Sequence, residues 1–118
     1  MMKIICSLIL ALTMSLSGVE KVQAENCQAI LFQSGAFSHT VQGMAPPDDG
    51  ICYEITASAG QTADITIAGN NVMFSIDGVV DAQDSYSFVI EKKIYKIFVG
   101  QLMRSVSKEP FALKVTIK

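Results

Sequence analysis

The sequence is poor in the residues from which catalytic and metal sites are usually built. Its 118 residues include no Trp, one His and three Cys. His39 stands in a polar stretch far from any zinc-type spacing, and no serine lies in a Gly-x-Ser-x-Gly nucleophile motif. No histidine remains to act as a base elsewhere. We therefore expect no catalytic residues, no metal site and no cofactor.

Positive charge is also scarce. The formal net charge is −2, and Arg104 is the only arginine. A domain of this charge is not a nucleic-acid binder driven by bulk positive charge. The basic residues that follow the N-terminal segment all lie at or after Lys92, whereas most acidic residues precede it. One edge of the fold is therefore expected to be locally basic.

Long apolar runs are absent except at the N-terminus. A short positive start that contains Lys3 precedes an apolar run over residues 4–16, and small residues at Val22 and Ala24 suit signal peptidase. The pattern predicts a signal peptide over residues 1–24, cleaved after Ala24, and one exported domain over residues 25–118. The apolar run is too short to span a membrane, and no lipobox precedes Cys6 or Cys27. We expect no membrane association after cleavage.

Cysteine use agrees with export. Cleavage would leave Cys27 and Cys52, an even number in a small exported domain. A single disulfide contributes most in that setting, so the two are predicted to pair.

Apolar residues alternate with polar ones along most of the domain, clearest in residues 95–99 and 111–117. Period-two alternation predicts β-strands, and no segment has helical periodicity. About eight short strands separated by turns predict an all-β fold, an antiparallel β-sandwich. Residues 28–32 and 36–42 are predicted to form one hairpin, and residues 51–57 and 61–68 a second.

The connection over residues 100–110 is the best candidate for a binding surface. It carries Arg104, Ser105, Ser107 and Lys108 between two clear strands. Arginine is enriched at interface hot spots and forms paired hydrogen bonds with carboxylates, so this loop is predicted to bind a protein. Tyr53 is added to this partner-binding set on the expectation that its phenol end reaches the rim of the sandwich.

Other ligands remain open on the residues alone. A sandwich module could bind a glycan through the phenol ends of Tyr53, Tyr86 and Tyr95, or calcium through Asp77, Asp81 and Asp84. It could equally bind another envelope protein. The tyrosines fall in the inward phase of their strands, and the aspartates lack the spacing of a calcium loop, which favours protein recognition.

Several stretches resemble the periplasmic inhibitors of g-type lysozyme: Ser-Ala-Gly-Gln at residues 58–61, Tyr-x-Ile-x-Val at 95–99, Gln-Leu-Met-Arg-Ser at 101–105 and Phe-x-Leu-x-Val-x-Ile at 111–117. The organisation is also similar to the pre-peptidase C-terminal sandwich domain. In the inhibitor family a loop rich in Arg and Ser enters the lysozyme cleft together with a neighbouring loop, which implies contact roles for Arg104 and Ser105.

The resemblance therefore implies a periplasmic protein whose partner is a lysozyme of the g type. Its mechanism would be occlusion of the active-site cleft, which needs no catalytic residue. A monomer and a homodimer are both compatible with the sequence. The alternative hypothesis is a general extracytoplasmic binding or stabilising module.

Overall fold

A computed structural model describes residues 26–32 and 37–118 of the chain, so the predicted signal peptide and its cleavage site lie outside the described residues. The described chain forms β-strands joined by turns and loops, and no helix in this part of the chain is long and apolar enough to cross a membrane. The strands are β1 (Gln28–Ala29), β2 (Ser38–Ala45), β3 (Ile51–Thr56), β4 (Thr62–Ala68), β5 (Val72–Ile76), β6 (Val80–Gln83), β7 (Ser85–Val89), β8 (Ile94–Gln101) and β9 (Glu109–Ile117).

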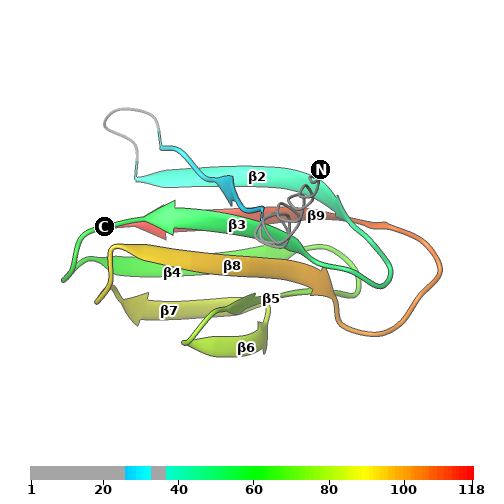
Figure 1. Cartoon of the computed structure of the whole chain (residues 1–118). Helices are drawn as coiled ribbons and strands as arrows, with labels where there is room; N and C mark the ends of the chain where they lie inside the picture. The colour runs from blue at the N-terminus through cyan, green and yellow to red at the C-terminus, as the bar shows by residue number, and fades with distance from the viewer. Residues whose placement is uncertain (1–25, 33–36) are drawn as a thin grey trace, which may run out of the picture.

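These strands form the two layers of a β-sandwich (Figure 1). One sheet has five strands in the order β1-β3-β8-β5-β6, and the other has four in the order β2-β9-β4-β7. All pairs are antiparallel except β1 with β3. The predicted all-β sandwich is confirmed, with the short strand β6 as an addition that the sequence pattern did not indicate.

Both predicted hairpins are wrong. β1 pairs in parallel with β3, whereas β2 lies in the other sheet and pairs with β9. β3 pairs with β8, and β4 lies between β9 and β7. Successive strands often cross between the two layers here, because each layer must supply an apolar face to the same core. Closeness in sequence therefore did not indicate pairing.

The core lies between the two sheets and follows the alternation in the sequence. In β8 the buried residues are Tyr95, Ile97 and Val99, and in β9 they are Phe111, Leu113, Val115 and Ile117. Neither strand lies at a sheet edge. The connection between β8 and β9 is therefore attached at both ends to well-buried strands.

The predicted disulfide between Cys27 and Cys52 is confirmed. The parallel pairing of β1 with β3 sets Gln28 opposite Tyr53. Cys27 and Cys52 directly precede these two residues and therefore lie next to each other. The Cα atoms of the two cysteines are 4.6 Å apart. The bond ties the start of the described chain to the five-stranded sheet.

Candidate functional site

The loop between β8 and β9, residues 102–108, is the candidate site. It projects from one end of the sandwich, drawn in orange in Figure 1. It is shorter than the predicted connection because β8 continues to Gln101 and β9 begins at Glu109. The two strands do not pair with each other: the loop crosses from the five-stranded sheet to the four-stranded sheet.

The surface of this loop combines one cation with several apolar side chains. Arg104 is exposed, and its guanidinium makes no ion pair or hydrogen bond with any residue in the described ranges. Beside it in sequence, Leu102 is 61% exposed, Met103 is 69% exposed and Val106 is 97% exposed. Exposed apolar groups gathered on one loop are typical of a binding surface. Sequence reasoning selected the arginine and missed these three neighbours.

The other predicted loop residues divide into two groups. Ser107 and Lys108 are exposed and available to a partner. Ser105 is half-buried, and its hydroxyl lies 2.6 Å from Gln101 Oε1 and 2.9 Å from the Ser107 carbonyl oxygen. Part of the hydrogen-bonding capacity of Ser105 is therefore used within the loop.

Gln101, the last residue of β8, holds the C-terminal half of the loop in place. Its Nε2 donates to the carbonyl oxygens of Ala45, 3.0 Å away, and of Ser107, 2.8 Å away. These bonds join the loop to the end of β2 and fix the backbone three residues after Arg104. A glutamine at the end of a strand has no sequence signature for this role, so only the structure identifies it.

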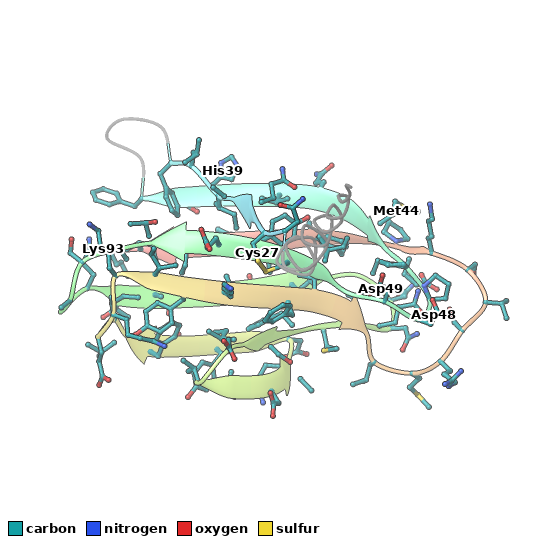
Figure 2. The ribbon with its side chains drawn as sticks, viewed as in Figure 1. Cys27, His39, Met44, Asp48, Asp49 and Lys93 are labelled. Carbon is teal, nitrogen blue, oxygen red and sulfur yellow. A yellow bond between two sulfur atoms is a disulfide. The ribbon has the colours of Figure 1, made fainter. Side chains whose placement is uncertain are left out.

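A shallow hollow of about 300 Å³ lies next to the loop. Its lining comes from the β2–β3 connection and the ends of β5 and β8: Pro47, Asp48, Asp49, Gly50, Met73, Phe98, Val99, Gly100 and Gln101. Figure 2 shows Asp48 and Asp49 at the end of the sandwich from which the β8–β9 loop projects. This end therefore presents a cationic loop beside an acidic connection.

Tyr53, the remaining residue of the predicted contact set, is placed in the core. Its side chain is 3% exposed and lies edge-on to Phe111, with ring centroids 6.5 Å apart. Burial raises the pKa of the Tyr53 phenol by desolvation. Because so little of its surface is accessible, we leave Tyr53 out of the proposed contact surface.

The structure also bears on the glycan and calcium alternatives. Tyr95 is buried, and its hydroxyl oxygen accepts hydrogen bonds from the backbone N–H groups of Glu91 and Lys92. Within residues 26–32 and 37–118, no three His, Cys, Asp or Glu residues are grouped so as to hold a metal ion. Asp77, Asp81 and Asp84 therefore form no such group.

Solved structures with this fold are known. The chain superimposes on PliG of Aeromonas hydrophila, a periplasmic inhibitor of g-type lysozyme, with a TM-score of 0.68 and 26% sequence identity, over 79% of this chain and 96% of that one. The resemblance to the periplasmic inhibitors of g-type lysozyme is confirmed. No family model and no curated protein matches the sequence.

PliG from two further bacteria has the same fold. The Salmonella Typhimurium protein and a mutant of the Escherichia coli protein each match with a TM-score of 0.63 and 18% identity, over 76% of this chain and 96% of theirs. The likeness to PliG thus covers nearly the whole of each inhibitor rather than a shared substructure.

Proposed function

We propose that this protein is a periplasmic inhibitor of g-type lysozyme. The inhibitor inserts its β8–β9 loop into the active-site cleft of the enzyme. One observation carries the proposal: the loop of a PliG-like fold presents an exposed guanidinium, that of Arg104, without a partner in the described chain. The protein is not an enzyme in this proposal, and it acts in the periplasm.

The chemistry of the loop suits a muramidase cleft. Glycoside hydrolases of this kind place carboxyl groups on either side of the scissile bond. A guanidinium can bind a carboxylate through two parallel hydrogen bonds, which are stronger than bonds between neutral groups. Because Arg104 has no partner within the described ranges, binding a carboxylate breaks no ion pair there.

The apolar residues around Arg104 supply the second half of the interaction. Leu102, Met103 and Val106 are largely exposed in the free protein, so contact with a cleft would remove their surface from water. Their burial would also exclude water from the ion pair and strengthen it. The cleft that fits this loop has an acidic centre with apolar walls.

The test is inhibition of purified lysozymes by the domain and by matched variants. The wild-type domain should slow clearing of cell walls by a g-type lysozyme, and a panel of g-, i- and c-type enzymes measures the preference. Arg104→Ala should raise the inhibition constant about 30-fold or more, equal to roughly 2 kcal/mol. Arg104→Lys keeps the charge without the paired geometry and should recover only part of the affinity.

Lys114→Ala is the control, because it removes one exposed cation from β9, outside the loop. It should leave the inhibition constant unchanged. A wild-type domain that inhibits none of the three classes would overturn the proposed function. Inhibition that Arg104→Ala does not weaken would keep the function and overturn the site.

A further inference from the structure

Asn71 lies in the connection between β4 and β5, which crosses between the sheets as the β8–β9 loop does. Its φ angle is +56°, in the left-handed region that Asn and Gly adopt more readily than other residues. This conformation belongs to a turn that the sequence Gly-Asn-Asn at residues 69–71 already predicts. The contacts of its side chain are what the sequence does not show.

Asn71 binds the backbone of the β8–β9 loop through main-chain and side-chain atoms together. Its carbonyl oxygen accepts from the N–H of Leu102 at 3.0 Å. Its side-chain Oδ1 accepts from the N–H of Met103 at 2.8 Å, and its Nδ2 donates to the Met103 carbonyl oxygen at 2.9 Å. Both backbone polar groups of the residue before Arg104 are therefore bound by one asparagine side chain.

The Asn71 amide also connects to the second anchor of the loop. Its Nδ2 lies 3.3 Å from Gln101 Oε1, the same oxygen that faces the Ser105 hydroxyl. The loop is thus held at Met103 by Asn71 and at Ser107 by Gln101. Arg104, Ser105 and Val106 form the short segment between these two points.

The loop has no apolar anchor of its own. Residues 102–104 and 106–108 are all exposed, and Ser105 is half-buried. A loop without buried side chains is held in one conformation only by its polar contacts. Without them, a partner would have to order the loop on binding, which lowers affinity.

We propose that Asn71 is a positioning residue for the inhibitory loop: it holds the backbone at Met103 so that Arg104 is presented in its binding conformation before a partner arrives. This inference rests on the proposed function for its effect on inhibition. Its structural half, the ordering of Met103 by Asn71, is measurable without any lysozyme.

The experiment compares Asn71→Gly, Asn71→Asp and Asn70→Gly in the full domain. Glycine accepts the left-handed backbone but removes the side chain, so the turn is retained and the loop loses its anchor. Aspartate keeps an acceptor for the Met103 N–H and loses the donor to the Met103 carbonyl oxygen. Asn70 is exposed, is the neighbouring asparagine of the same turn and makes no side-chain hydrogen bond in the described chain, which makes it the matched control.

Two measurements decide the outcome, with melting temperatures recorded to confirm folding. Hydrogen exchange of the Met103 amide should become at least about tenfold faster in Asn71→Gly, remain near wild type in Asn70→Gly, and be partly protected in Asn71→Asp. The inhibition constant should follow the same order, rising about tenfold in Asn71→Gly.

Unchanged Met103 exchange in Asn71→Gly would overturn the inference, because the side chain would then not order the loop. Faster exchange with unchanged inhibition would overturn it as well, because ordering would then not matter for binding. A wild-type domain that inhibits no lysozyme would remove the proposed function instead, and the exchange result would still decide whether Asn71 orders the loop.

Discussion

Removing the Cys27–Cys52 disulfide should lower the stability of the domain by a predictable amount. The bond joins residues separated by 25 positions in the sequence. In the loop-entropy model, closing a loop of this length in the unfolded chain contributes about 3.5 kcal/mol at 25 °C. The free energy of unfolding of a small domain is roughly 5 to 15 kcal/mol, so the disulfide contributes a large share of it.

The structure indicates which part of the domain should unfold first when the disulfide is removed. Apart from the disulfide, the start of the described chain is held by the two-residue pairing of β1, by the burial of Ile30, and by the 2.9 Å hydrogen bond from the Ile30 N–H to the Glu54 carbonyl oxygen. Phe32 adds a partly buried ring that packs against the core and lies edge-on to His39. Burying one isoleucine contributes only about 1.5 to 3 kcal/mol. We therefore expect β1 to detach before the rest of the sandwich unfolds.

The assay is urea unfolding of the double variant Cys27→Ala/Cys52→Ala, which avoids leaving a free thiol. Its midpoint should fall by about 1 to 3 M relative to wild type. Thr56→Ala, an exposed change at the end of β3, serves as the control and should unfold near the wild-type midpoint. A loss below about 1 kcal/mol in the double variant would refute the reasoning, because the loop-entropy contribution would then be absent.

Two further predictions concern the packing of the sandwich. Gly69 has φ +145°, and a Cβ there would lie 2.6 Å from the Pro110 carbonyl oxygen, whereas Gly60 has φ +94° with open space around it. Each change to alanine should lower the free energy of unfolding by about 1 to 3 kcal/mol through the backbone conformation alone. Thermal unfolding should show a larger loss of stability in Gly69→Ala than in Gly60→Ala, because only the first also creates the close contact. Equal losses would contradict the close contact. Desolvation raises the pKa of Tyr53 in the folded domain above its ordinary value of 10.0, so folding favours the neutral phenol. The stability that depends on this neutral phenol is fully present below pH 10.0 and is lost as pH rises through the raised pKa. Melting temperatures between about pH 9 and 11 should decline less steeply in Tyr53→Phe, and parallel profiles would argue against this coupling.

The local features of the fold could be read from the chain. The alternation of Phe111, Leu113, Val115 and Ile117 indicates a strand with one buried face, because successive side chains of a strand point to opposite sides. Cys27 and Cys52 were predicted to pair from their number and the exported setting, and they do. Arg104 was placed correctly in a loop between two strands.

Strand partners could not be read in the same way. A period of two tells which face of β3 is buried, but it is equally compatible with β4 or β8 as the neighbour. The choice of β8 depends on how both layers pack around one core, to which residues distant in sequence contribute. The parallel pairing of β1 with β3 likewise depends on how the two layers pack around the core.

The candidate site divides along the same line. The Arg104 loop was selected from features of neighbouring residues, which the sequence contains, and its role as the contact site stays a prediction. Only the tertiary structure exposed Leu102 and Val106 and brought Asn71 against Met103, 32 residues away along the chain. Hydrogen bonds across that separation form only once both sheets are assembled, so no local pattern in the sequence encodes them.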